Sequence, residues 1–271
     1  MIRGIFTIWF LLLALSTVNG QSKFDEILNN FILKGKSLDR YGVEIDSMQG
    51  MTKEELKILR NAIFAKHGYR FKNQGLLDYF KESYSWYNPR YDDVKIKNKV
   101  DLANLRLIQV LETPKELRFK KLAEQFNQIQ FPFDLSREAL FNDYYQEELC
   151  GYYTLTYIKP SYDGGYFYSY YHAIGKIAET DNFIALLYRG DLPLDNTEAW
   201  YTLAIQKKDG EPISEYTVAR ISYRELITAY ITEDLVITIK HFDRTGNGFD
   251  KEPARVEKKK VNNFGEIIDN I

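Results

Sequence analysis

The sequence predicts an α+β protein in which a small, mainly helical N-terminal domain precedes an antiparallel all-β meander, either a barrel or a sandwich. Two observations support this fold class. Apolar residues recur at helical spacing as far as about residue 130, and from Tyr152 onward they alternate as they do in strands. Turn residues then separate the apolar runs at short intervals with no helical pattern between them, which is typical of antiparallel neighbours.

The length of the chain and its charge distribution both indicate two domains. A chain of 271 residues exceeds the usual size of one domain. We expect a signal peptide at residues 1–20, a helical domain with a trailing helix at residues 21–130 and an antiparallel β domain at residues 131–271. The first domain contains 20 Lys and Arg against 15 Asp and Glu, and the second contains 15 against 23. This contrast favours either attraction between the domains or contact of the basic domain with an anionic wall polymer or lipid head group.

The N-terminus has the features of a secretory signal peptide. Arg3 supplies a positive charge, residues 5–15 form an apolar core shorter than a membrane span, and small residues end at Gly20. Cleavage there leaves Gln21 as the first residue and no transmembrane anchor, so we expect an exported protein, periplasmic or extracellular. The single cysteine, Cys150, cannot form an intramolecular disulfide, and we interpret it as a buried thiol.

The helical domain has a clear start signal and a clear stop signal for its first helix. Thr52 and Glu55 have the spacing of a capping box, in which the two side chains satisfy free backbone N–H groups at a helix start. Gly68 stands where a left-handed residue closes a helix. These signals predict a helix over Lys53–His67, and a shorter second helix follows at residues 76–80.

The rest of this domain is predicted from aromatic anchors and prolines. Trp86 is a natural clamp over a small core, and Pro89 ends regular structure. A third helix is predicted over residues 100–111, and Thr113-Pro114 begins a fourth. The domain boundary is expected near Gln130.

The order of these features resembles the YARHG domain, a small module of secreted and surface-exposed bacterial proteins. The resemblance covers residues 51–111, and it implies an extracytoplasmic binding or structural module without established catalytic residues. Phe64 stands in place of the Tyr of the family and Lys66 in place of the Arg, which removes a phenol hydroxyl and a planar guanidinium. The matching segments are Arg60-Asn61, Phe64-Ala65-Lys66-His67-Gly68, Leu77-x-Tyr79-Phe80, Trp86-Tyr87-x-Pro89 and Asp101-Leu102-Ala103-Asn104-Leu105.

One side of the first helix is a candidate binding surface, because Arg60 and His67 lie seven positions apart and therefore on the same side. If that side is internal, Arg60 needs carbonyl groups or an acid such as Asp78 or Asp101 as a partner. If it is external, it is the best binding surface of this domain. We favour the internal arrangement.

The β domain is predicted from seven strands and four turns. The strands are rich in aromatic and branched residues, and the turns are rich in residues that accept positive φ angles. The expected strands are residues 152–158, 166–173, 183–188, 200–206, 216–221, 227–231 and 235–241. The expected turns are residues 163–165, 180–182, 209–210 and 246–248.

A row of tyrosines is the second candidate binding surface. Alternation places Tyr166, Tyr168 and Tyr170 on one face of a strand. Such a row stacks on sugar rings or clasps a peptide, since tyrosine has a flat apolar body and a polar tip. Core packing or cross-strand pairing explains the same row, and we favour that explanation.

The sequence contains no clear metal, cofactor or catalytic motif. The three histidines, His67, His172 and His241, are far apart and there is one cysteine, so no metal cluster is expected. The run that begins at Asp243 has the spacing of half a calcium loop, but Ala254 occupies the position of the bidentate acid. No nucleophile elbow or phosphate-binding glycine loop is present. A nucleic-acid partner is not expected for an exported chain with a net charge of −2.

These observations favour a non-enzymatic binding or assembly protein of the bacterial cell envelope. Its expected partner is an envelope polymer, glycan or peptide, or another envelope protein. The alternative is a hydrolase of envelope glycan or peptide with acidic residues in a cleft between the two domains. An aromatic-lined cleft with two inward acids within catalytic distance would favour the hydrolase, and a solid β core with a flat, polar domain junction would favour the binding protein.

Overall fold

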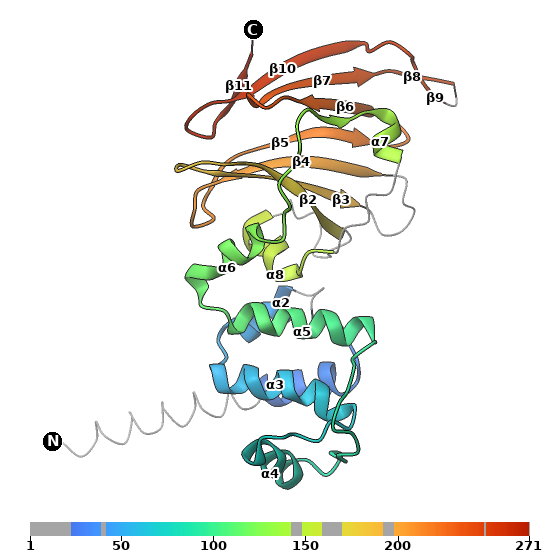
Figure 1. Cartoon of the computed structure of the whole chain (residues 1–271). Coiled ribbons are helices and arrows are strands. Elements are labelled where there is room, and N and C mark those ends of the chain that lie inside the picture. Colours follow the sequence, from blue (N-terminus) through green and yellow to red (C-terminus); the bar gives the residue numbers. More distant parts are fainter. Residues whose placement is uncertain are drawn as a thin grey trace, which may run out of the picture. The chain divides into compact units, whose positions relative to one another are not determined.

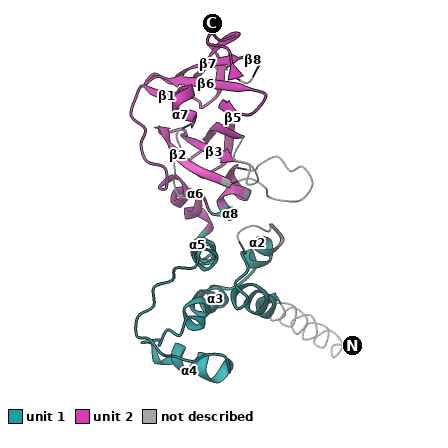
Figure 2. Cartoon of the chain, turned by 90° about the vertical axis from the view of Figure 1, so that its right-hand side faces the viewer, with its two compact units in different colours: residues 1–114, 150–152 teal, residues 115–149, 153–271 magenta. Residues whose placement is uncertain are grey.

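The structure is a computed structural model that describes residues 23–38, 42–141, 148–158, 170–191, 198–246 and 248–270. The chain divides into two compact units (Figure 2). The first is Met1–Pro114 with Cys150–Tyr152, and the second is Lys115–Leu149 with Tyr153–Ile271. The sequence places the division near Gln130, whereas helix α6, Lys115–Ala123, belongs to the second unit. The expected signal peptide lies outside the described residues.

The first unit is helical and contains the three helices predicted between residues 53 and 111. They are α3 (Lys53–Lys66), α4 (Gln74–Ser83) and α5 (Lys99–Glu112). A π-helix at Ile27–Ile32 and helix α2 (Gly42–Gln49) precede them and were not predicted.

The boundaries of α3 follow the predicted signals. The Thr52 hydroxyl accepts a hydrogen bond from the Glu55 amide at 3.2 Å, and the Glu55 carboxylate accepts one from the Thr52 amide at 2.7 Å. This is the predicted capping box. His67 caps the other end, and Gly68 has a φ of +81°, a left-handed conformation that glycine adopts without strain.

Helix α3 packs on α5 and on the π-helix through apolar side chains that recur every three or four residues. Leu59 and Ile63 of α3 and Leu107 and Ile108 of α5 are fully buried. Ile32 is also fully buried. This contact removes apolar surface from water and holds the helices of the unit together.

The second unit contains an antiparallel sheet, as predicted. Its order is β11-β10-β7-β6-β5-β4-β3-β2, and β1 pairs with β6, which gives nine strands among the described residues. The strands are β1 (Phe133–Leu135), β2 (Tyr170–Glu179), β3 (Ile184–Asp191), β4 (Ala199–Gln206), β5 (Pro212–Ile221), β6 (Leu226–Ile231), β7 (Val236–Phe242), β10 (Arg255–Val261) and β11 (Ile267–Asp269). A separate hairpin joins β8 (Arg244–Thr245) and β9 (Gly248–Phe249).

The sheet bends into two layers and does not close into a barrel. Strands β5 and β6 are paired only at Arg220–Ile227 and Ile221–Leu226, and β1 pairs with β6 over Phe133–Leu135. Strands β2 to β5 therefore form one layer, and β6, β7, β10 and β11 form another (Figure 1). The core between them includes Leu203, Ile205, Ile237 and Ile239, all fully buried. Of the two predicted forms of the meander, barrel and sandwich, the structure therefore fits the sandwich.

The expected strand at residues 152–158 is wrong. Helix α8 (Gly151–Tyr153) and a π-helical turn (Thr154–Ile158) occupy this segment. Its aromatic and branched residues favour a strand locally, but Tyr152, Tyr153 and Thr154 are all buried. Three consecutive buried side chains do not fit a strand with one covered face, so tertiary packing overrides the local preference. Cys150, just before, is buried and forms no disulfide, as expected.

The strands from residue 183 to residue 242 agree with the prediction within a few residues. The turn at residues 180–182 joins β2 to β3, and Gly210, with a φ of +93°, lies between β4 and β5. The predicted strand 166–173 is described only from Tyr170, and the turn 163–165 lies outside the described residues. Strands β1, β8, β9, β10 and β11 were not predicted.

Candidate functional site

The candidate surface on α3 contains His67, which is held by a buried acid. Asp101, in the first turn of α5, has a side chain only 2% exposed. One of its carboxylate oxygens lies 2.7 Å from His67 Nε2 and the other 2.6 Å from Lys66 Nζ. Lys66 Nζ also donates to the Ile32 carbonyl at 2.7 Å. These contacts tie the end of α3 to the start of α5 and to the π-helix.

Arg60, the other predicted residue of this surface, also has a partner on α5. Its Nη1 lies 2.7 Å from Glu112 Oε2, and its side chain is one third exposed. Burial raises the pKa of the Glu112 carboxyl, and the positive charges of Arg60 and Lys57 oppose that shift. The sequence offered Asp101 as a partner for Arg60, whereas the structure pairs Asp101 with Lys66 and His67. A binding role for Arg60 and His67 stays a prediction.

An aromatic cluster fills the end of the helical unit around α4. Phe80 is fully buried, and its ring stacks on Phe71 with centroids 5.1 Å apart. Tyr87 is buried beside both rings and donates a hydrogen bond to the Tyr69 carbonyl at 2.8 Å. Trp86, the expected clamp, is only half-buried at the edge of the cluster. Phe80 therefore occupies the central position that the sequence suggested for Trp86.

The predicted tyrosine row is only partly covered by the structure. Tyr166 and Tyr168 lie outside the described residues. Tyr170 begins β2 and pairs with Asp191 of β3, and nothing is described of its side chain. Tyr171, on the opposite face, is buried against the rings of Tyr188 and Trp200. The row stays a predicted binding surface.

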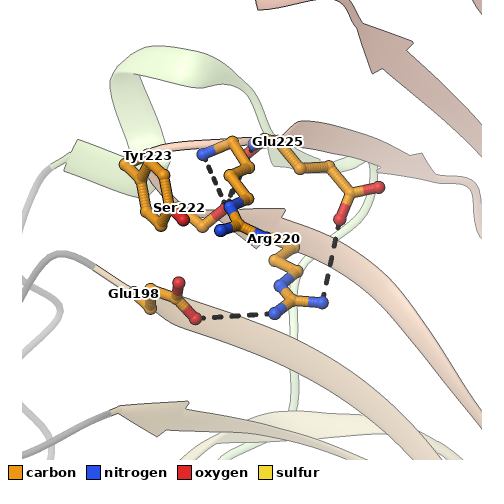
Figure 3. Close-up of a pocket in the computed structure, with 6 residues that line it drawn as sticks. Glu198, Arg220, Ser222, Tyr223 and Glu225 are labelled. Atoms are coloured by element: carbon orange, nitrogen blue, oxygen red, sulfur yellow. Dashed lines mark hydrogen bonds and ion pairs between the residues drawn. The ribbon is translucent and has the colours of Figure 1, made fainter.

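A pocket of about 400 Å³ lies at the β5–β6 turn of the second unit (Figure 3). Glu198 precedes β4, Arg220 comes from the end of β5, and the other lining residues belong to the turn where β5 separates from β6. The lining residues are Glu198, Arg220, Ser222, Tyr223, Arg224 and Glu225. The pairing of Ala199 with Ile221 places Glu198 beside this turn, so two acids, two arginines and a tyrosine lie together.

Arg220 lies between the two acids of the pocket, as Figure 3 shows. Its Nη2 lies 3.5 Å from Glu198 Oε2, and its Nη1 lies 3.7 Å from Glu225 Oε2. Its Nε is buried and has no hydrogen-bond partner among the described residues. The Ser222 hydroxyl accepts hydrogen bonds from the amides of Arg224 and Glu225, which fixes the turn.

Tyr223 forms the rim of the pocket and is 51% exposed. The guanidinium carbons of Arg224 and Arg244 lie 4.8 Å and 5.9 Å from the centre of its ring. Arg244 also donates a hydrogen bond to the Tyr223 carbonyl. In the described part of the chain, neither arginine forms an ion pair with an acid. The ring therefore orders two cationic groups that remain available to an anion.

A polar cluster centred on Glu257 lies at one side of the β core. One Glu257 oxygen lies 2.8 Å from His241 Nε2, and it accepts hydrogen bonds from the Tyr216 hydroxyl at 3.1 Å and from Arg255 at 3.3 Å. Burial raises the pKa of the Glu257 carboxyl, but these three partners together lower it by more. The resulting pKa is below the ordinary value of 4.5.

This shift predicts a pH-dependent effect of Glu257→Gln. Because the pKa of Glu257 is lower in the folded state, its charge stabilises the fold above the ordinary pKa, and that stabilisation is lost as the pH falls through the folded pKa. We expect Glu257→Gln to lower the melting temperature at neutral pH and to approach the wild type as the pH falls below the ordinary value of 4.5. Thermal melts across pH measure this. Glu252→Gln, at an exposed position, is the control, and an equal gap at every pH would refute the prediction.

Within the described ranges, no group of three or more His, Cys, Asp or Glu side chains could hold a metal ion. A search of the same residues for a helix long and apolar enough to cross a membrane found none.

The fold defines a two-unit protein, a helical unit followed by a bent antiparallel sheet, with an arginine-rich pocket on the sheet. Residues 32–113 match the family model of the YARHG domain, so the helical unit contains this module and the resemblance seen in the sequence is confirmed. A search of curated proteins found no match, and neither did a search of solved structures.

Sequence reasoning missed the pocket. Its one signal is the segment Ser222-Tyr223-Arg224-Glu225, a tight turn in which a large aromatic and two charged residues stand where glycine or asparagine is more common. Glu198 and Arg244 are about twenty or more residues from this turn in sequence, and the pairing of β4 with β5 and of β6 with β7 brings them near it.

Proposed function

We propose that the protein is an exported, non-enzymatic binding protein of the bacterial envelope, in which the β unit holds an acidic glycan at the Arg220 pocket. The observation behind this proposal is the pair of guanidinium groups of Arg224 and Arg244 on the exposed ring of Tyr223. Guanidinium groups bind carboxylates through paired, charged hydrogen bonds. The acids Glu198 and Glu225 can accept hydrogen bonds from sugar hydroxyls, which both donate and accept.

The helical unit has a structural role in this proposal. Lys66 and His67 of the YARHG signature are engaged by Asp101 inside the unit. The side chains that identify the module therefore support its own packing. The match to an extracellular type of module supports export.

Binding to a polyuronate tests the pocket. We expect affinity electrophoresis in polygalacturonate to retard the mature chain, whereas neutral dextran does not. Charged hydrogen bonds contribute about 1.5–3 kcal/mol each, so Arg224→Gln with Arg244→Gln is expected to weaken retardation at least tenfold. Arg90→Gln, at an exposed position of the helical unit, is the matched control.

Two outcomes would contradict this proposal. Equal retardation of the wild type and the double variant would show that the pocket is not part of the binding surface. Release of shorter fragments from the polyuronate would instead support the alternative, a hydrolase.

Export itself predicts a cleaved mature chain. The apolar segment and the small residues that end at Gly20 favour removal of the first twenty residues. Mass spectrometry of the protein recovered from the producing cell is expected to show Gln21 as the first residue. An intact chain that begins with Met1 in the cytoplasm would contradict the proposed localisation.

A further inference from the structure

The outer face of the layer β6-β7-β10-β11 combines lysines with exposed apolar side chains. In antiparallel pairs, directly opposite residues point to the same face. The register places Tyr230 opposite Thr238 and Thr238 opposite Lys258 in one row. A second row contains Lys240 and Val256, and a third contains Lys260 and Ile268. We call this surface the lysine face: Tyr230, Lys240, Val256, Lys258, Lys260 and Ile268.

The apolar members of the lysine face are unusually exposed for strand residues. Tyr230 is 41% exposed, Val256 is 51% exposed and Ile268 is 45% exposed. They point away from the sandwich core, because Ile231, Ile237 and Val261, which occupy the opposite face of the same layer in the register, are buried in it. Each of the three exposed apolar residues shares its row with a lysine, so apolar and cationic side chains are interspersed over the outer face of this layer.

The lysines of this face are not neutralised by acids of the same strands. In the described part of the chain, Lys240, Lys258 and Lys260 form no side-chain hydrogen bond or ion pair. The pKa of the Asp234 carboxyl is lowered mainly by a hydrogen bond from Thr232, and the positive charge of Lys260 lowers it as well. Asp134 of β1, opposite Tyr230, bounds the face on the other side. The face is therefore basic on a unit whose sequence is acidic overall.

The spacing of the lysines matches a planar array of negative charges. Neighbouring strands lie about 4.8 Å apart, and alternate residues of a strand lie about 7 Å apart. Lys258 and Lys260 are alternate residues of β10, and Lys240 is on the neighbouring strand β7, opposite Val256 and therefore two residue pairs from Lys258. The three lysines are thus distributed both along and across the strands of one layer.

We propose that the lysine face docks the protein on an anionic lipid surface. Lysines beside a membrane gain favourable energy from acidic head groups, and tyrosine with branched apolar side chains is stable at the head-group boundary. A soluble polyanion would pair with the lysines but would leave Tyr230, Val256 and Ile268 in water, so the mixed face favours a bilayer. This contact does not depend on the Arg220 pocket.

Vesicle sedimentation tests the proposal with the full mature chain. The wild type is expected to sediment with vesicles that contain phosphatidylglycerol and to remain in solution with pure phosphatidylcholine. One lysine near an anionic surface changes binding about fivefold, so the variant with Lys240→Gln, Lys258→Gln and Lys260→Gln should bind about a hundredfold more weakly. The matched control carries Lys53→Gln, Lys72→Gln and Lys81→Gln at exposed positions of the helical unit and should bind as the wild type does.

A second variant separates a bilayer from a polymer. With Tyr230→Ser, Val256→Ser and Ile268→Ser, we expect weaker binding to the anionic vesicles and unchanged binding to soluble dextran sulfate. Circular dichroism melts show that each variant is folded. The proposal is overturned if the control triple weakens binding as much as the lysine-face triple, or if the serine variant binds anionic vesicles as the wild type does.

Discussion

Replacing Asp101 by asparagine is expected to lower the free energy of unfolding of the helical unit by about 3 kcal/mol. The Asp101 carboxylate is almost fully buried and has two cationic partners, Lys66 and His67. Asparagine keeps the volume but removes the charge, so the Lys66 ammonium, whose side chain is only 17% exposed, loses its counter-ion. Removing one partner of a buried ion pair lowers the free energy of unfolding strongly, because the remaining charge is buried without a counter-ion.

Hydrogen exchange of the α5 amides in the full chain measures this change, because local opening of the helical unit exposes them. Asp92→Asn is the control, since its carboxylate is 77% exposed and pairs with Arg70 at 3.1 Å. An exposed pair of this kind contributes at most about 1 kcal/mol.

A double variant shows whether the cost comes from the unpaired charge. Lys66→Met removes the ammonium group. We therefore expect this substitution to lower the free energy of unfolding less in the Asp101→Asn background than in the wild type. If the two effects simply add, the Asp101 carboxylate and Lys66 are not coupled, and the structural interpretation of the signature residues fails.

The parts of this fold that follow from local chemistry were predictable from the sequence. The capping box at Thr52 and Glu55 and the left-handed Gly68 each depend on a few neighbouring residues, and both are present in the structure. The strands between residues 183 and 242 were predictable from short runs of branched and aromatic residues bounded by turn residues, a signal that holds even for β3 and β4, which are buried on both faces.

The contacts that decide the roles of side chains depend on the tertiary structure. Asp101 is 34 residues after His67, and which basic residue it would pair with was not visible in the sequence. The sequence left two arrangements open for Arg60, an internal one with a partner such as Asp78 or Asp101 and an external one, and the packing of α3 on α5 places Glu112 beside it. Strand β10 was missed because Lys258, Lys259 and Lys260 interrupt the apolar alternation that indicates a strand.

Phe80→Ala is expected to lower the free energy of unfolding of the helical unit by about 4 kcal/mol. The ring is fully buried and lies within 6.3 Å, centroid to centroid, of Phe71, Tyr84, Trp86 and Tyr87. Alanine leaves a cavity that these rings cannot fill without losing their own contacts, so both the transfer energy and the packing energy are lost. Urea denaturation followed by hydrogen exchange of α4 and α5 measures the change.

Trp86→Ala distinguishes the centre of this cluster from its edge. Trp86 contacts Tyr84, with centroids 5.2 Å apart, but the indole is half-buried, so its truncation removes less apolar surface from the core. We expect a loss of about half that of Phe80→Ala, because a partly solvated site leaves a smaller cavity. Phe80→Leu, which keeps most of the volume, is the control and should cost less than either. If Trp86→Ala lowers the free energy of unfolding as much as Phe80→Ala does, then the indole rather than Phe80 anchors the module. In that case the solvent-facing side of Trp86 could not contact a ligand without unfolding the cluster.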